Sequence, residues 1–305
     1  MILVTGASGL LGANLVWSAL RAGDEVAAQY HAYPVHFPAV QVLDSDLTQP
    51  SSVRALVRAV KPDWIVHCAA ATDVDWCEEH PAEAARINVE AAGNVAATAK
   101  EARARLLLVS TDAVFDGRRG GYSEKDAPAP LNVYGATKRA GEQAVLKAVP
   151  SALIVRTNLY GWNVQPKQSL AEWVLGRLER GETVPGFEDV RFTPILADEL
   201  GEMLLAMTDR SLEGTYHVAG SESLTKYEFA RRVANVFGLD ARSVHPVRIE
   251  SSSLRAPRPR NTTLRTEAAA RALGRPMPTA DSGLRRFRAD RDSGYVEKLK
   301  ACRGG

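Results

Sequence analysis

The N-terminal segment constrains the fold most, because a strand, a glycine turn and a helix follow one another without interruption. Residues 1–5 are apolar and β-branched, glycines recur at every third position from Gly6 to Gly12, and residues 13–21 form an amphipathic pattern. Such glycines permit a tight turn in which a phosphate approaches backbone N–H groups at the helix N-terminus. The segment therefore predicts a dinucleotide site. Its expected contacts are Gly6, Ser8, Gly9, Leu10, Leu11 and Gly12.

Strand and helix patterns then alternate through the first half of the chain. Further strands are predicted at residues 25–30, 40–43, 64–71, 105–110 and 153–156. Helices are predicted from about Pro50, from Pro81 to about residue 104, and around residues 136–145. Apolar strands separated by helices predict an α/β fold with a Rossmann-type doubly wound parallel sheet.

The second half does not repeat this rhythm. It is predicted to hold short irregular pieces at 184–195, a strand at 215–219 and an arginine-rich basic tail, with helices at 169–179, 197–207, 226–237 and 266–273. We predict a dinucleotide-binding domain of residues 1–156 with returning segments near 193–219. Residues 157–192 and 220–305 are expected to form a smaller, interleaved C-terminal substrate-binding domain.

The end of the second strand bears on the choice of coenzyme. An NAD site usually places an acidic residue there to bind the ribose hydroxyls, but here the strand ends in Gln29, Tyr30 and His31. No acid repels a 2′-phosphate and no arginine binds one, so NAD(H) and NADP(H) both stay open, with a preference for NADP(H). After the third strand, Asp46, beside Leu47, would bind the adenine amino group or cap the next helix, and both alternatives stay open.

Two further places point to the carboxyl edge of the sheet. A buried strand ends in Ala69, Ala70 and Ala71, whose small side chains would let a dinucleotide lie against the backbone. Thr111 ends the next strand, and open parallel sheets bind ligands at such ends. Its hydroxyl would hold a substrate carbonyl oxygen or would only cap a turn. Asn88, inside the long helix, is expected to be a helix-face polar group or to form a bend near the site.

Tyr134 and Lys138 form a candidate proton-donating pair. They lie four residues apart on a predicted helix and therefore share one face. A free phenol has a pKa of about 10, and a nearby cation favours the phenolate. We therefore expect Lys138 to bring the pKa of Tyr134 toward working pH, where proton transfer is efficient.

Composition excludes several classes of function. The 305 residues are 45% hydrophobic with a net charge of +2, so strong electrostatic binding of nucleic acid or of a membrane surface is not expected. The three cysteines are few and odd in number, which favours a reducing compartment over a disulfide framework. They also lack metal-ligand spacing, and we predict no metal site. Because neither a signal peptide nor a membrane-spanning apolar run is found, we expect a cytoplasmic protein.

The glycine turn, Thr111 and the Tyr134-x-x-x-Lys138 pattern together resemble the extended short-chain dehydrogenases/reductases. More narrowly, the chain is similar to the dTDP-4-dehydrorhamnose reductase family and its sugar-nucleotide relatives. The matching stretches are residues 68–75, 109–117, 129–142, 214–219 and 258–264. Two departures, Trp76 and the segment 189–194, lie where the sugar is expected.

The resemblance implies reduction of a 4-keto group on a nucleotide-linked deoxysugar by NADH or NADPH. Tyr134 would give a proton to the developing alkoxide, and Lys138 would lower the phenol pKa and hold the nicotinamide ribose. Thr111 would orient the carbonyl oxygen. Arg258 is our candidate for the diphosphate, because a guanidinium fork suits phosphate oxygens. The expected substrate contacts are Thr72, Asp73, Arg156, Trp162, Arg258 and Asn261.

Other interpretations of single residues and of the whole chain stay open. Core packing fits Trp162 equally well, and His67 and His217 are interpreted as core histidines. A dehydratase is not expected, because Ala113 stands where those enzymes carry a glutamate. A sugar-nucleotide epimerase and a dinucleotide-binding regulatory subunit without turnover remain as alternatives. The expected partners are a nucleotide sugar and, at most, a second copy of the chain in a homodimer.

Overall fold

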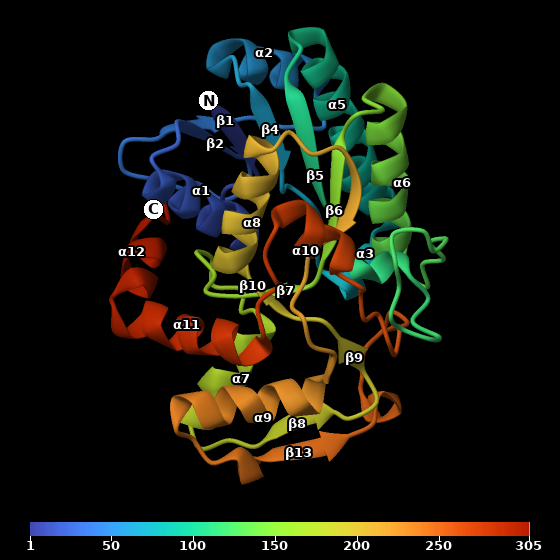
Figure 1. The fold of residues 1–305 in the computed structure, drawn as a ribbon, viewed down its shortest axis with the longest axis vertical. Helices are drawn as coiled ribbons and strands as arrows, with labels where there is room; N and C mark the ends of the chain where they lie inside the picture. The colour runs from blue at the N-terminus through green and yellow to red at the C-terminus, as the bar shows by residue number, and fades with distance from the viewer. Residues whose placement is uncertain (305) are drawn as a thin grey trace.

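A seven-stranded parallel sheet forms the centre of the molecule (Figure 1), and the computed structural model describes residues 1–304. The strand order is β11-β6-β5-β4-β1-β2-β3, so the winding direction reverses between β1 and β4. Such a reversal opens a crevice at the carboxyl ends of the strands. The strands are β1 Ile2–Thr5, β2 Val26–Tyr30, β3 Gln41–Asp44, β4 Trp64–His67, β5 Arg105–Thr111, β6 Leu153–Thr157 and β11 Gly214–His217. The predicted Rossmann-type doubly wound fold is confirmed.

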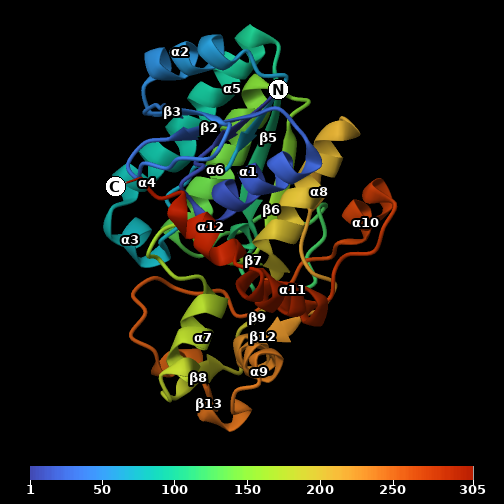
Figure 2. The same cartoon turned by 90° about the vertical axis from the view of Figure 1, so that its left-hand side faces the viewer.

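Successive strand residues face two separate apolar cores. Val4 and Val66 belong to the core on the side of α1 and α8, whereas Leu3 and Ile65 belong to the core beneath α2, α5 and α6. This alternation follows the strand period of two, and burial of both faces is typical of parallel sheets. The covering helices are α1 Leu10–Ala22, α8 Ala197–Asp209, α2 Pro50–Val60, α5 Ala91–Ala102 and α6 Val133–Ala148 (Figures 1 and 2). Among residues 1–304, no helix is long and apolar enough to cross a membrane.

The long helix predicted from Pro81 is interrupted. It consists of α4 Pro81–Ala85, a π-helical turn Arg86–Glu90 and α5. Asn88 lies in the π turn, and its amide accepts from Ala71 N at 2.8 Å and donates to Ala71 O at 3.1 Å and Thr137 Oγ1 at 3.0 Å. The extra residue of a π turn redirects a side chain, often at a functional site. Of the two expectations for Asn88, the bend near the site is therefore confirmed.

A smaller lobe lies beyond the carboxyl edge of the sheet (Figure 1). Its main elements are α7 Leu170–Glu179, α9 Lys226–Phe237 and the parallel strands β8 Val184–Phe187 and β13 Val244–Val247. Two short strand pairs lie between lobe and sheet: β7 Leu159–Tyr160 with β10 Ile195–Leu196, and β9 Arg191–Phe192 with β12 Leu224–Thr225. The irregular pieces predicted at 184–195 are thus three short strands, each paired with a distant segment.

The prediction of a basic tail at the C-terminus is wrong, because this part of the chain is folded into helices. Residues 280–301 form α11 Ala280–Asp292 and α12 Tyr295–Ala301, because Leu284 and Phe287 are fully buried beneath the arginines. The ring of Tyr295 in α12 meets Trp17 of α1 edge-on, so α12 packs on the dinucleotide-binding half. Helix α11 also contacts the lobe, where Phe287 meets Phe237 of α9 edge-on and Arg291 donates to Glu179 of α7 at 2.7 Å. The expected domain boundaries otherwise stay a prediction. The helix predicted at 266–273 is confirmed as α10 Glu267–Leu273. The elements not anticipated from the sequence are α3 Val74–Glu79 and the 3₁₀ turns Asp112–Val114, Ala241–Ser243 and Ile249–Ser251.

Candidate active site

The glycine turn has the geometry that close approach of a ligand requires. Gly6 adopts a left-handed φ of +66°, and a side chain there would overlap the backbone of Ala69 after β4. A Cβ on Gly12 would overlap the carbonyl oxygen of Gly6. Gly9 is the N-cap of α1 and has no side chain with which to cap the helix, so the first N–H groups, from Leu10 onward, remain available to a phosphate. The residues present therefore fit a dinucleotide.

Gln29 fastens the end of β2 to the glycine turn. Its buried amide accepts from Gly6 N at 3.0 Å and donates to the carbonyl oxygen of Ser45 at 2.6 Å. This role of Gln29 was not predicted, because it depends on the turn at Ser45, which lies 16 residues further along the chain. His31 is exposed, with Nδ1 3.2 Å from Asp44 Oδ1. The preference for NADP(H) over NAD(H) stays a prediction.

Asp46 does not cap the second helix, so that alternative is wrong. Its Oδ1 accepts from the backbone N and the hydroxyl of Thr48, at 2.9 and 2.7 Å, within a tight turn, and the N-cap of α2 is Gln49. Leu47 is buried, and Asn94 Nδ2 donates to its carbonyl oxygen at 3.1 Å. The turn is thereby fixed beside the crevice, and contact of Asp46 with adenine stays a prediction.

Helix α6 is placed against the end of β5 by two residues at its start. Asn132 caps the helix by accepting from Gly135 N at 2.8 Å and donates to Pro257 O at 2.9 Å. A Cβ on Gly135 would overlap the carbonyl oxygen of Ala113, so only glycine lets the first turn of α6 lie so close. As a result Tyr134, in that first turn, faces Thr111 at the end of β5.

The three predicted catalytic residues meet at the crevice. The hydroxyl of Thr111 is close enough to the phenol of Tyr134 to lower its pKa. Lys138 is buried one helical turn further on, and its Nζ donates to the carbonyl oxygen of Val109 on β5 at 2.8 Å. Ala69, Ala70 and Ala71 lie half-buried after β4, which ends at His67 and not at residue 71.

The pKa of Tyr134 does not move toward working pH, so that expectation is wrong. Desolvation raises the pKa of Tyr134 to about 12, and the nearby hydroxyl of Thr111 opposes this only in part. Desolvation also lowers the pKa of Lys138 to about 8, against an upward pull from Glu142. Burial disfavours the charged form of each group. The phenol consequently keeps its proton at neutral pH, as a proton donor must.

A cavity of about 400 Å³ lies on the lobe side of the crevice and is rich in arginine. Arg258 is half-buried there, with its guanidinium 3.0 Å from Asp75 Oδ1, and Asn261 lies beside it. Arg191 and Arg260 line the same cavity. Neither arginine was among the predicted substrate contacts, although the clustering of arginine around residues 255–260 was a usable signal for Arg260. Guanidinium groups in this number suit phosphate oxygens.

Arg156 and Trp162 do not line a sugar pocket, and both expectations are corrected. Arg156 is buried and donates to both carboxylate oxygens of Glu142, at 2.9 and 2.8 Å. Trp162 stacks on Phe287 with centroids 4.0 Å apart, and its indole N–H donates to Phe287 O at 2.8 Å. Both side chains point into the protein, because each finds a buried hydrogen-bond acceptor there.

The remaining predicted residues divide between the crevice rim and the core. Thr72 is exposed, and Asp73 caps α3 by accepting from Trp76 N at 3.0 Å. His67 is buried with Nδ1 2.7 Å from Thr5 Oγ1, and His217 is buried against the carbonyl oxygen of Tyr122. The interpretation of both histidines as core residues is confirmed. Contacts of Thr72 and Asp73 with substrate stay a prediction.

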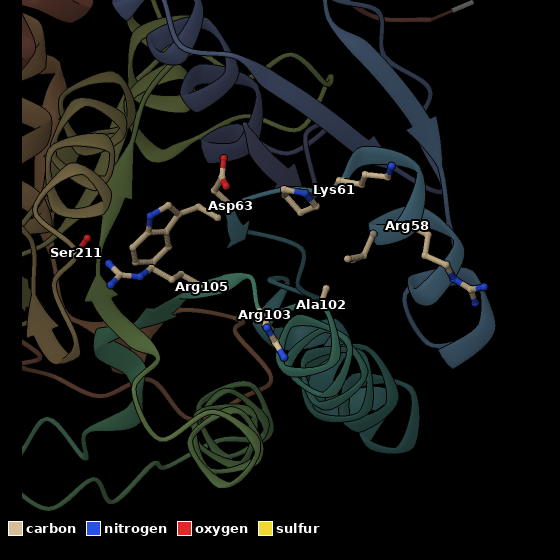
Figure 3. Close-up of a pocket in the computed structure, with 10 residues that line it drawn as sticks. Arg58, Lys61, Asp63, Ala102, Arg103, Arg105 and Ser211 are labelled. Atoms are coloured by element: carbon tan, nitrogen blue, oxygen red, sulfur yellow. The ribbon is translucent and has the colours of Figure 1, made fainter.

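A second cleft, of about 590 Å³, lies at the opposite edge of the sheet (Figure 3). Trp64 and Arg105, the first residues of β4 and β5, lie side by side in it, with Arg58 and Lys61 on the other side. Lys61 and Arg103 are the C-caps of α2 and α5, where basic residues complement the helix dipole. This cleft is remote from Thr111 and Tyr134. Its basic residues are explained by their positions at helix ends and do not indicate a ligand.

Fold and site together define the class. A doubly wound sheet with a phosphate-accepting glycine turn and a Thr–Tyr–Lys group at its carboxyl edge is an NAD(P)-dependent oxidoreductase of the extended short-chain dehydrogenase/reductase type. Whole-chain comparisons narrow this class to one family.

The chain belongs to the family described as RmlD substrate binding domain, whose model matches residues 1–292. It is 35% identical over 287 residues to the probable low-salt glycan biosynthesis reductase Agl14 of Haloferax volcanii, covering 92% of this chain and 95% of that protein. It is also 35% identical over 279 residues to methionine adenosyltransferase 2 subunit beta of Pongo abelii, covering 86% and 79%.

Among solved structures, dTDP-4-dehydrorhamnose reductase from Bacillus anthracis in complex with NADP matches with a TM-score of 0.84 and 32% identity. The match covers 95% of this chain and 98% of that one. The resemblance inferred from the sequence motifs is therefore confirmed.

Proposed function

We propose that the protein reduces the 4-keto group of a nucleotide-linked deoxysugar with NADPH or NADH. The observation that carries this proposal is the meeting of Thr111, Tyr134 and Lys138 beside the crevice above the glycine turn. The reductases among its relatives support the same chemistry, and NADP bound in the Bacillus anthracis enzyme supports the coenzyme.

The chain's own residues supply binding, orientation and a proton. The reduced nicotinamide supplies the hydride when it is bound. The hydroxyl of Thr111, which donates to Asp112 Oδ1 at 3.2 Å in the structure, would turn its O–H to the ketone oxygen and align it. The protonated phenol of Tyr134 gives its proton to the developing alkoxide. Lys138, which hydrogen-bonds a β5 carbonyl, turns its remaining N–H groups to the ribose hydroxyls. Proton donation of this kind typically contributes about 10²–10⁴ in rate.

The arginine-lined cavity accounts for the nucleotide part of the substrate. Arg258 with Arg191 and Arg260 would hold the diphosphate, with Asn261 at the cavity wall. Asp75 pairs with Arg258 and holds its guanidinium in place, which reduces the side-chain entropy lost on binding.

We further propose a cytoplasmic location, in line with the few unpaired cysteines. We also propose a homodimer, which light scattering of the purified protein would test.

The test is oxidation of NADPH and NADH with a panel of 4-keto nucleotide sugars. Tyr134→Phe should lower turnover by about 10²–10⁴ while leaving the coenzyme dissociation constant nearly unchanged, because the phenol proton is needed only in the chemical step. Tyr216→Phe, on the edge strand β11, is the matched control and should retain full turnover. Unchanged turnover of Tyr134→Phe would remove Tyr134 as the acid.

A second candidate is a dinucleotide-binding regulatory subunit, favoured by the 35% identity with methionine adenosyltransferase 2 subunit beta. The intact Thr111, Tyr134 and Lys138 argue for turnover. Tight coenzyme binding without oxidation by any sugar in the panel would favour the regulatory subunit. Interconversion of nucleotide sugars without net coenzyme consumption would favour an epimerase instead.

A further inference from the structure

The arginine-lined cavity also contains a carboxylate with one oxygen left without a hydrogen bond. Asp189, in the connection from β8 to β9, lines this cavity, and its side chain is only 12% exposed. Its Oδ1 accepts from Ile249 N at 3.0 Å, but among residues 1–304 no group donates a hydrogen bond to the buried Oδ2. A buried acceptor of this kind is costly unless a donor reaches it.

A neighbouring arginine balances the charge of Asp189 without hydrogen-bonding to it. Arg260 Nη1 lies 3.8 Å from Oδ2, beyond hydrogen-bonding distance, and Arg260 Nη2 donates to Glu250 instead. Arg260 is half-exposed, so a small movement of its guanidinium opens Oδ2 to the cavity while the two charges stay close. With its charge balanced, Oδ2 suits a neutral O–H or N–H donor. A phosphate oxygen does not suit it, because like charges repel.

Asp189 lies at the end of the cavity that is farther from the reacting centre. At the near end, Asn261 lines the cavity, and the next residue, Thr262, donates to Asp112, which directly follows Thr111. At the far end, the carboxylate of Asp189 is bonded to the turn after β13, a lobe strand that lies away from the sheet (Figure 1). A sugar at the catalytic edge, with its diphosphate on the arginines, therefore extends its nucleoside toward Asp189.

We propose that Asp189 is a specificity-determining residue that accepts a hydrogen bond from the nucleoside part of the substrate. The donor is neutral, either a hydroxyl of the pentose or the ring N–H of the base. The inference rests on the proposed function and deepens it, because it assigns a residue that recognises the nucleoside. A site with a buried acceptor rejects an analogue that lacks the matching donor, since the acceptor then stays unpaired.

Equilibrium binding of three ligands tests the inference without requiring turnover. Thymidine diphosphate, its 3′-deoxy analogue and its analogue methylated at the ring N–H of the base are titrated by calorimetry into the protein saturated with NADP⁺, which keeps the coenzyme site occupied. The wild type should bind one of the analogues about 10- to 100-fold more weakly than thymidine diphosphate, the usual effect of losing a hydrogen bond to a charged group. The weaker analogue identifies the donor as the pentose hydroxyl or the base N–H.

Asp189→Asn should reduce this discrimination to less than about threefold, because an amide nitrogen replaces the accepting oxygen. The amide oxygen still accepts from Ile249 N, so the melting temperature should change little. Loss of a negative charge near the arginines strengthens the binding of all three ligands alike, and the ratio of dissociation constants is therefore the quantity compared. Glu188→Gln, which neutralises the exposed neighbouring carboxylate, is the matched control and should preserve the ratio.

The outcomes separate the inference from the proposed function. Equal binding of the three ligands by the wild type, or discrimination that survives in Asp189→Asn, would overturn the inference. Failure of the wild type to bind thymidine diphosphate would overturn both the inference and the assignment of the cavity to the nucleotide. Absence of NADPH oxidation with every 4-keto nucleotide sugar, while the discrimination is intact, would overturn the proposed reaction alone.

Discussion

Burial at the crevice desolvates both Tyr134 and Lys138. This one cause moves their pKa values in opposite directions. Burial disfavours a phenolate and an ammonium alike, so the phenol pKa rises while the ammonium pKa falls to about 8. At neutral pH the site therefore holds a protonated phenol beside a charged lysine. That is the ionisation state that proton donation to an alkoxide needs.

The rate should fall in alkaline solution because Lys138 loses its charge. Its protonated fraction drops about tenfold per pH unit above a pKa of about 8, so kcat/KM should show a basic limb there. Lys138→Arg, whose guanidinium stays charged, should move the limb to higher pH even if the rate is lower.

The measurement is initial NADPH oxidation between pH 6 and 10 at fixed ionic strength. Because the pKa of Lys226 is also lowered to about 8, the profile of Lys226→Met is the necessary control and should keep the limb. A profile that stays flat to about pH 9.5 would contradict the role of Lys138.

At the scale of elements, hydrogen bonds of one buried carboxylate, that of Glu142, hold α6 against the sheet. Glu142, one turn beyond Lys138, accepts from Arg156 on β6, from Arg139, and from Ser110 on β5 at 2.6 Å. These bonds keep the pKa of Glu142 below its usual value despite burial. The network sets the distance between α6 and β5, and therefore the distance between Tyr134 and Thr111.

Arg156→Met should destabilise the protein by about 3–5 kcal/mol, because it leaves a buried carboxylate without its charged partner. Urea unfolding followed by circular dichroism measures this change. Arg242→Met, which removes an exposed arginine paired with Asp240, is the control and should have no measurable effect.

The double variant Glu142→Leu with Arg156→Met removes both charges and should recover much of the lost stability. A single variant as stable as the wild type would show that the ion pair does not hold α6. The double variant is also expected to turn over more slowly, because α6 is no longer positioned by the carboxylate.

At the scale of the molecule, a polar cluster ties three helices across one face of the sheet. Asp198 of α8 is buried and pairs with Arg21 of α1 and Arg286 of α11, and it accepts from Ser18 at 3.0 Å. The adjoining Glu199 of α8 lies against α11, and desolvation raises its pKa to about 7. The attachment of the C-terminal helices to the dinucleotide-binding half is thus sensitive to protons.

Glu199 should make the folded protein less stable as the pH rises from about 4.5 to about 7. Its pKa is higher in the folded state than in the unfolded chain, so the folded state binds more protons over that range. Glu199→Gln should abolish this component, which amounts to about 1–3 kcal/mol.

Urea unfolding at several pH values compares the two slopes of stability against pH. Glu213→Gln, which changes an exposed carboxyl, serves as control and should preserve the wild-type slope. Identical slopes for the wild type and Glu199→Gln would contradict the assignment.

The sequence by itself determined the doubly wound sheet and the glycine turn, and it singled out Thr111, Tyr134 and Lys138 as the candidate catalytic residues, because these depend on local spacing. Strand alternation, glycine geometry and a four-residue helical repeat act over a few residues and can be recognised without knowing distant contacts.

Only the tertiary structure decided what depends on partners far along the chain. Arg156 pairs with Glu142 and does not line the predicted pocket, and Trp162 stacks on Phe287. The arginine-rich C-terminal part forms two helices, because Leu284 is buried beneath it. The buried carboxylate of Asp112 accepts from Thr262, which lies 150 residues further along the chain. Desolvation also reversed the expected pKa of Tyr134, because burial is a property of the whole fold and not of a local pattern.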